Sequence, residues 1–250
     1  MVKEMSQKLV YDGLQSCPYL PGQVARMPLY RQLAPLSLDQ ADTRFANAER
    51  RVGTCLYRTA CPTCSACQGL RIPVADFRPS KSQRRVARKW ARHGRVELGP
   101  VQFDDAKLAL FNRHKRERGL SEGENDPMDP LGYIGWLVHS CVLTVEMRYL
   151  YDDALVGVGI LDLGRVAASS VYFYFDPDKG ELSPGTFSAL EEVDLCRRTG
   201  RDHLYLGLYV ADCRHLSYKA NFHPHERLID GDWRRFEKRE PREGPAHGPP

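Results

Sequence analysis

The pattern of apolar and polar positions predicts helices first and strands afterwards. From about Ser80 the pattern is helical, with Val86 and Trp90 on one face and basic residues over the rest. A second helix is expected from Asp104, a residue type that caps helix N-termini, to about Arg118. A loop rich in Gly, Pro and acidic residues should follow.

The second half of the chain reads mainly as strands. Residues 142–150 and 154–163 predict a hairpin, and 169–175 a further strand. A helix over residues 186–198 and a strand over 203–211 should come next, and a strand–helix–strand step favours parallel pairing. This order predicts an α+β fold. Alternation places Val171, Phe173 and Phe175 opposite Tyr172 and Tyr174, and puts Tyr205, Gly207 and Tyr209 on one side.

The beginning and end of the chain lack this regularity. Residues 1–75 are rich in Pro and Cys with few periodic segments, so we expect an irregular region there. We divide the chain into a Cys-containing, basic N-terminal region (residues 1–100), a sheet domain (residues 101–238) and a Pro/Gly/charge-rich tail (residues 239–250) that should be disordered. A chain of 250 residues has room for this organisation.

Charge is distributed unevenly, although the net charge is only +4. Residues 71–118 contain fourteen Lys/Arg and five Asp/Glu (net +9), whereas residues 119–196 contain three and fourteen (net −11). A solvated salt-bridged face is the alternative, but this density of one sign favours a surface for a polyanion. The candidate polyanion contacts are Arg71, Lys81, Arg84, Arg85 and Arg88.

Nothing in the sequence indicates a membrane partner. No run of 18 apolar residues exists, and residues 1–10 lack the apolar core of a secretory signal. We therefore expect a cytoplasmic location, where cysteines are reduced thiols or metal ligands.

Three cysteines occur within seven residues, at Cys61, Cys64 and Cys67. Two-residue gaps allow successive thiolates to bind one metal, zinc or an iron–sulfur cluster. Cys17 is the candidate fourth ligand, and Cys55 competes with it. Packed or redox-active thiols remain the alternative.

Several runs of the chain form an ordered set that spans about residues 11–236. They include Cys17-Pro-Tyr-Leu-Pro-Gly, Phe77-Arg-Pro-Ser-Lys-Ser-Gln-Arg-Arg-Val86, Ser170-Val-Tyr172-Phe-Tyr174-Phe-Asp176-Pro-Asp178, Gly185-Thr186, Tyr205-Leu-Gly207 and Tyr218-Lys219. In order and spacing, this set resembles the bacterial branch of the arginyl-tRNA–protein transferase family, which includes the aspartate/glutamate leucyltransferases. One departure is Glu49-Arg50-Arg51-Val52-Gly53, where the family tends to have Trp-Arg-Arg-Ser-Gly.

The resemblance implies transfer of an amino acid, usually leucine, from charged tRNA to proteins beginning with Asp or Glu, which marks them for the N-degron pathway. It also implies a GNAT-type acyltransferase sheet, no cofactor required for the chemistry, and no DNA partner. An arginyl-tRNA-dependent transferase is the first alternative. A non-catalytic, zinc-containing RNA-binding protein is the second, because a basic helix, clustered cysteines and aromatic residues would suit it.

An aminoacyl ester is already activated, so alignment and oxyanion stabilisation should suffice without a conspicuous nucleophile. Asp176 could hold the acceptor's ammonium group or accept its proton, or only form a turn. The tyrosines could stack on the terminal adenine or fill a core, and Lys219 could contact a phosphate or an acidic acceptor. The resemblance thus implies catalytic roles for Tyr172, Asp176, Thr186 and Tyr209, and substrate binding by Tyr174, Gly185, Tyr205 and Lys219 beside the basic residues.

Overall fold

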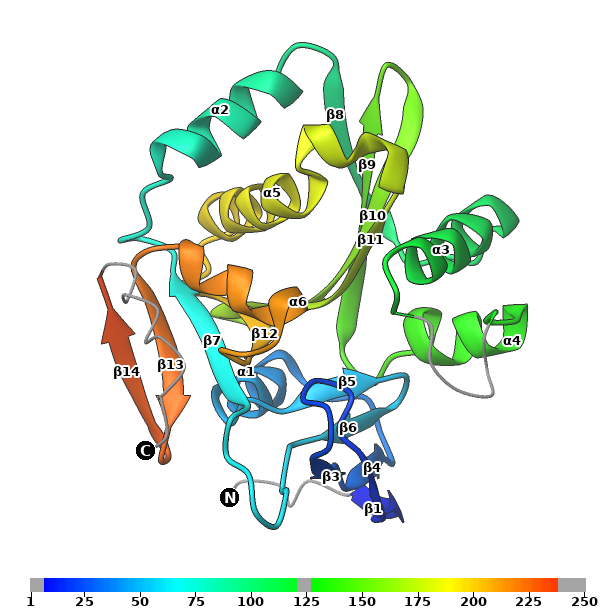
Figure 1. Cartoon of the computed structure of the whole chain (residues 1–250), viewed down its shortest axis with the longest axis vertical. Helices are drawn as coiled ribbons and strands as arrows, with labels where there is room; N and C mark the ends of the chain where they lie inside the picture. Colours follow the sequence, from blue (N-terminus) through cyan, green and yellow to red (C-terminus); the bar gives the residue numbers. More distant parts are fainter. Residues whose placement is uncertain (1–6, 121–126, 238–250) are drawn as a thin grey trace, which may run out of the picture.

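A large mixed β-sheet forms the centre of the computed structural model, which describes residues 7–120 and 127–237 (Figure 1). The order of its eight strands is β14 (Asp232–Phe236), β13 (His225–Ile229), β7 (Gln68–Pro73), β12 (His203–Tyr209), β11 (Ala167–Phe175), β10 (Ala154–Leu163), β9 (Leu143–Tyr151) and β8 (Gly94–Pro100). The mixed sheet with helices confirms the expected α+β class. The sheet takes strands from both sides of residue 100.

Helices cover both faces of this sheet. Helices α2 (Lys81–Trp90) and α5 (Pro184–Arg198) lie on one face, and α3 (Asp105–Glu117) and α4 (Pro130–Tyr133) lie on the other (Figure 1). The short elements are η1 (Ile134–Val138), η2 (Pro177–Leu182), α6 (Arg214–Ser217) and η3 (Tyr218–Asn221). None of the helices in the two described segments is long and apolar enough to cross a membrane.

The helices of the first half begin where their capping residues predict. The hydroxyl of Ser80 accepts a hydrogen bond from the Gln83 N–H, and the Gln83 side chain accepts one from the Ser80 N–H, so two unpaired donors are satisfied. Asp104 accepts hydrogen bonds from the first N–H groups of α3. Both predicted helices are confirmed.

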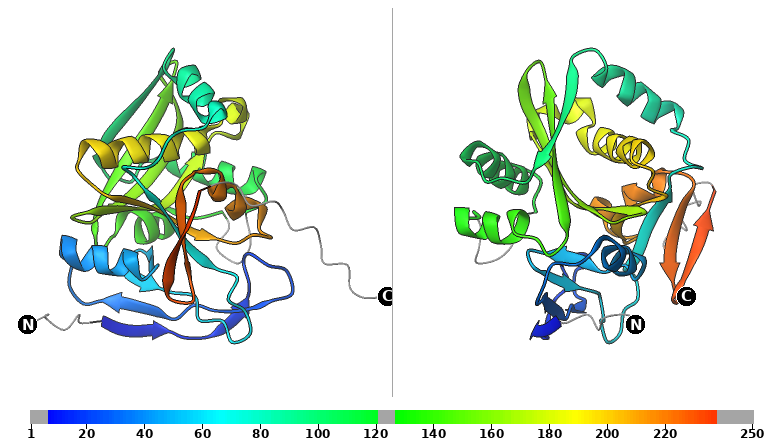
Figure 2. Two further views of the ribbon diagram at one scale, coloured as in Figure 1. Left: turned by 90° about the vertical axis from the view of Figure 1, so that its left-hand side faces the viewer. Right: turned by 180° about the vertical axis from the view of Figure 1, so that it is seen from behind.

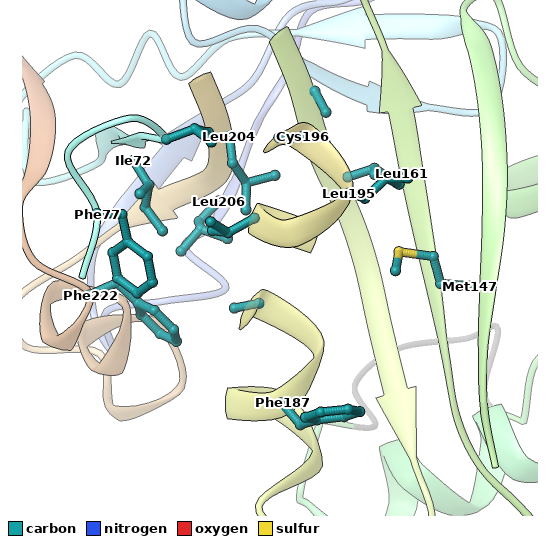
Figure 3. Close-up of a cluster of buried hydrophobic side chains, with 14 of the residues drawn as sticks. Ile72, Phe77, Met147, Leu161, Phe187, Leu195, Cys196, Leu204, Leu206 and Phe222 are labelled. Carbon is teal, nitrogen blue, oxygen red and sulfur yellow. The ribbon is translucent and has the colours of Figure 1, made fainter. Parts of the chain in front are cut away.

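The main core lies between the sheet and α5. Figure 3 shows Leu195 of α5 beside Leu161 of β10, with Phe187 farther along the same helix and Met147 on the neighbouring strand; all four belong to this core. On α2, Trp90 is fully buried, stacks on Phe187 at 4.3 Å between ring centres, and donates to the Leu182 carbonyl. The stack fixes α2 against the start of α5.

The described part of the region 1–75, which begins at residue 7, is more regular than expected from its composition. The region contains several short strands and one helix, so the prediction of an irregular region is wrong. Strands of three to five residues leave too little periodicity in the sequence to be detected. These strands lie at one end of the large sheet (Figure 2). The elements are β1 (Gln7–Tyr11), β4 (Leu29–Gln32), β6 (Cys55–Tyr57) and β5 (Arg50–Val52) in one sheet, β2 (Leu14–Ser16) with β3 (Val24–Arg26) in another, and α1 (Leu38–Ala46). The predicted disordered tail, residues 239–250, lies outside the described residues.

The strand–helix–strand step has the predicted parallel pairing, but over a short length. Only three residues of each strand pair, with Ala167–Ser169 of β11 opposite His203–Tyr205 of β12. Beyond these three pairs the strands diverge. Because α5 connects them and runs back from the end of β11, its first turn lies toward the open end of the gap.

Two β-bulges accompany the divergence and overturn the predicted side-chain alternation. The register shifts between Tyr172 and Ser170, so Val171 packs on the same face as Tyr172. A second shift, between Tyr205 and Gly207, places Tyr205 and Tyr209 in clusters on opposite faces. An extra residue in a strand reverses the faces that follow it.

Candidate active site

The gap between β11 and β12 is filled by one side chain from the N-terminal sheet. Arg50 of β5 donates from Nη2 to the carbonyls of Ser170 (2.7 Å) and Val171 (3.1 Å), and from Nη1 to the Ser169 hydroxyl (3.2 Å). These carbonyls do not have β12 as a partner, so the guanidinium group satisfies acceptors that the divergence leaves open. Across the gap, Gly207 has a φ of +85°.

The neighbouring residue anchors this arrangement. Arg51 points to the opposite side of β5 and forms an ion pair with Asp162 of β10 at 2.8 Å, where both side chains are almost fully buried. It also donates to the His139 carbonyl at 3.0 Å. Two consecutive arginines thus attach the small sheet to β10 and β11, and this fixes where Arg50 enters the gap.

A buried carboxyl group lies on the α5 side of the gap. Glu192 accepts hydrogen bonds from Ser188 (3.2 Å) and Ser170 (3.3 Å) through Oε1, and Oε2 has no hydrogen-bond partner within the described segments. Burial raises the pKa of Glu192 to about 7, against the hydrogen bonds from these serines and the charges of Lys219 and Arg50. Near neutrality this group therefore exists in both protonation states.

Lys219 of η3 approaches the gap from the β12 side. Its Nζ donates to the Leu208 carbonyl at 2.8 Å, and Lys219 forms no ion pair with a carboxylate of the described chain. Burial, with a further contribution from the charge of Arg50, lowers the pKa of Lys219 to about 7. The gap thus brings together a guanidinium, an amine that titrates near neutrality and a carboxyl group that does the same.

The aromatic residues expected to bind substrate are divided between the core and half-buried positions. Tyr174 is fully buried, and its hydroxyl shares a hydrogen bond of 2.6 Å with the hydroxyl of Tyr133. Of the two roles considered for it, stacking on adenine or filling the core, its position is that of a core residue. Tyr172 is half-buried against Trp136 and Phe111. Its pKa is raised to about 12 by burial, so the hydroxyl stays neutral.

On β12 the predicted residues separate. Tyr205 is almost fully buried and accepts a hydrogen bond from Arg71 at 3.1 Å, and Arg71 forms an ion pair with Glu226 at 2.6 Å. Arg71 also lies over the Trp233 ring at 4.3 Å, so it is part of a packed cluster rather than of an open basic surface. Tyr209 is half-buried beneath the guanidinium of Arg227.

Asp176 and Thr186 are held by partners other than Arg50 and Lys219. Asp176 forms an ion pair with Arg113 at 2.9 Å and caps η2 through the Asp178 N–H, which is the turn-forming role. Thr186 donates its N–H to the Ser183 carbonyl at 3.0 Å, and Gly185 precedes it in the half-exposed first turn.

The basic segment does not form one surface, because α2 and α3 lie on opposite faces of the sheet. On α2, Lys81, Arg84 and Arg88 line one shallow hollow with Ala87. Arg85 is exposed on the same helix.

Helix α2 begins beside the segment that carries Lys219. The Gln83 side chain donates to the Asn221 carbonyl at 3.2 Å, and Phe77 packs on Phe222. The N-terminal end of α2 is therefore in contact with the segment that carries Lys219.

The four predicted metal-ligating cysteines gather near Cys67. Burial, and the proximity of Cys17, Cys61, Cys64 and Cys213, raise the pKa of the Cys67 thiol to about 12. Within residues 7–120 and 127–237, however, no three or more His, Cys, Asp or Glu side chains are arranged to hold a metal ion. The thiols are close together, but the described residues do not have the arrangement of a metal site.

The sequence interpretation missed three members of the site, namely Arg50, Ser170 in its contact with Glu192, and Glu192 itself. Arg50 left a signal, since Arg50, Arg51 and Gly53 agree with the family pattern, whereas Glu49 and Val52 depart from it. Glu192 left none, because a carboxylate on a helix is ordinarily a surface residue.

Comparison with known proteins identifies the family. Residues 15–85 match the family model described as arginine-tRNA-protein transferase, N terminus, and residues 106–229 match its C-terminal counterpart. The chain is 33% identical to an aspartate/glutamate leucyltransferase of Aeromonas hydrophila, covering 96% of this chain and 99% of that protein. An aspartate/glutamate leucyltransferase of Halorhodospira halophila is 34% identical, with 90% and 96% covered.

Among solved structures, the C-terminal domain of a putative lysylphosphatidylglycerol synthetase from Agrobacterium fabrum matches 58% of this chain and 47% of that one. The TM-score is 0.43 at 11% identity. The sequence matches are much more extensive. The chain belongs to the arginine-tRNA-protein transferase family and is an aminoacyl-tRNA–protein transferase.

Proposed function

We propose that this chain transfers leucine from leucyl-tRNA to the α-amino group of proteins that begin with Asp or Glu, and so marks them for the N-degron pathway. The relatives that cover almost its whole length are named for this donor and these acceptors. The observation that carries the proposal is the gap between β11 and β12, where Arg50, Glu192 and Lys219 converge.

The gap suits a reaction that needs alignment more than bond activation. Positioning an amine against an ester carbonyl can lower the barrier by about 7–11 kcal/mol. Arg50 and Lys219 supply N–H donors beside strand backbone that no longer pairs, and these donors suit the negative oxygen of a tetrahedral intermediate. The short parallel pairing and the bulge in β11 support an acyltransferase sheet of GNAT type.

The α2 face of Lys81, Arg84, Arg85 and Arg88 is the proposed tRNA contact. Its position next to η3 would bring the acceptor end of a bound tRNA toward the gap. Contacts of this kind bind phosphates without reading sequence and are sensitive to salt.

A second candidate donor is arginyl-tRNA, because the matching family models carry that name. The test is transfer from labelled leucyl-tRNA and arginyl-tRNA to peptides that begin with Asp, Glu or Arg. We expect leucine on the Asp and Glu peptides only. Label from arginyl-tRNA on those peptides, with none from leucyl-tRNA, would overturn the choice of donor.

A further inference from the structure

Lys219 is held in an unusual setting for a lysine. Among the described residues its Nζ makes one hydrogen bond, to the Leu208 carbonyl, at the point where β12 has already left β11. The residue is half-buried, and no carboxylate of the described chain forms an ion pair with it. The charge that affects it most is that of another cation, Arg50, which is fixed in place by three contacts to β11.

The charged and titratable groups that act on Lys219 come from three different segments of the chain. They are Arg50 from β5, Glu192 from α5 and Cys213 from the segment before α6. Burial and Arg50 disfavour the ammonium form, whereas Cys213 and Glu192 favour it, and the balance lowers the pKa of Lys219 to about 7. Of these charges, that of Glu192 has the smallest effect on Lys219.

Aminoacyl transfer needs a proton carrier at this place. When the acceptor's neutral amine attacks the ester carbonyl carbon, its nitrogen must lose a proton and the departing ribose oxygen must gain one. A group that exchanges protons near the working pH is best suited to that task.

Given the proposed function, we propose that Lys219 is this carrier: its neutral Nζ takes a proton from the attacking α-amino nitrogen and delivers it to the ribose oxygen. The C–N bond forms, the C–O bond to ribose breaks, and Lys219 ends neutral, as it began. Arg50 and Glu192 act as positioning residues. This role differs from a contact between a Lys219 cation and a phosphate or an acidic acceptor.

The two roles are separated by chemical rescue. Lys219→Ala should lower the rate of leucyl transfer about 100-fold or more, as is typical when a general acid–base group is removed. Added methylamine should restore part of the rate, in proportion to the concentration of its neutral form as pH is varied. Leucylated peptide is measured, so direct attack of methylamine on the ester is not counted.

The second variant is Lys219→Arg, which keeps a cation and donors able to reach the Leu208 carbonyl but cannot give up its proton. It should stay as slow as Lys219→Ala while binding leucyl-tRNA as wild type does. Near wild-type transfer by Lys219→Arg, or rescue that follows the methylammonium ion, would overturn the proton-carrier role and leave the proposed function standing. A wild-type chain that transfers nothing from either tRNA would contradict both.

Discussion

The guanidinium group of Arg50 occupies the space that a side chain at position 207 would need. A Cβ built on Gly207 would lie 2.9 Å from Cζ of Arg50, on a backbone whose φ is +85°. Arg50 and Gly207 lie on opposite sides of the gap, and the absence of a side chain on Gly207 leaves room for the guanidinium group. The separation of β11 and β12 at this point therefore depends on two residues that are far apart in the chain.

Gly207→Ala should therefore disturb the site as well as the backbone. The left-handed φ should destabilise the fold by about 1–3 kcal/mol, and the methyl group should displace Arg50 and lower transfer. Gly200→Ala is the matched control, since Gly200 also has a positive φ but nothing within 4 Å of the added Cβ. We expect both variants to lose stability in urea unfolding and only Gly207→Ala to lose transfer at a temperature where both are folded.

Arg50→Lys tests whether the fork of the guanidinium, and not only its charge, holds the site. One ammonium group cannot span the carbonyls of Ser170 and Val171 and the Ser169 hydroxyl together. Loss of part of these hydrogen bonds should slow leucyl transfer by about 10-fold or more. Arg198→Lys, on an exposed ion pair of α5, should leave the rate unchanged. Equal rates for wild type and Arg50→Lys would assign Arg50 a purely electrostatic role.

Glu192 should make stability depend on pH in a defined direction. Its pKa is about 7 in the folded chain and 4.5 ordinarily, so between these values the folded state binds more protons than the unfolded state. Stability is therefore fully present below about pH 4.5 and is lost as pH rises through 7, by about 3 kcal/mol in total from this group.

Glu192→Gln removes this contribution and keeps an acceptor for Ser188. The free energy of unfolding in urea, measured at pH 5 and pH 8, should fall less between the two values for the variant than for wild type. An equal fall in both proteins would mean that Glu192 does not titrate in this range.

The α2 surface should control the salt dependence of tRNA binding. Replacing Lys81, Arg84 and Arg88 by Ala should weaken binding and reduce the slope of log K against log salt by roughly 0.7–0.9 for each phosphate that is no longer neutralised. Lys115→Ala with Arg116→Ala, on α3 across the sheet, is the control and should leave the slope unchanged. The reverse result would move the tRNA to the α3 face.

The helices and the C-terminal strands could be predicted because their signals are local. Ser80 and Asp104 cap the helices whose starts they indicate, and the hairpin of β9 and β10 follows the alternation of its own residues. The faces of β11 and β12 could not be predicted beyond their bulges. A bulge depends on how neighbouring strands pair, which alternation in one strand does not contain.

The site was predictable only in part for a similar reason. Lys219 was singled out by its motif, but its partner carbonyl at Leu208 and its neighbour Arg50 come from other parts of the chain. The contact of Arg50 with Ser170 spans 120 positions. Asp176 and Tyr174 lie in motifs that match the family equally well. The Asp176 side chain nevertheless forms an ion pair, and Tyr174 is buried in the core. Motif matches identify residues of interest, and only the packing distinguishes between their roles.

The most direct test of the proposed function is the mass of the product. The purified chain, leucyl-tRNA and a peptide beginning with Asp should yield that peptide with one added leucyl group on its α-amine, and an N-acetylated copy should remain unchanged. Replacing the first residue by Asn should abolish most of the product. An unmodified Asp peptide after incubation with either leucyl- or arginyl-tRNA, while the chain binds both tRNAs, would contradict the proposed reaction.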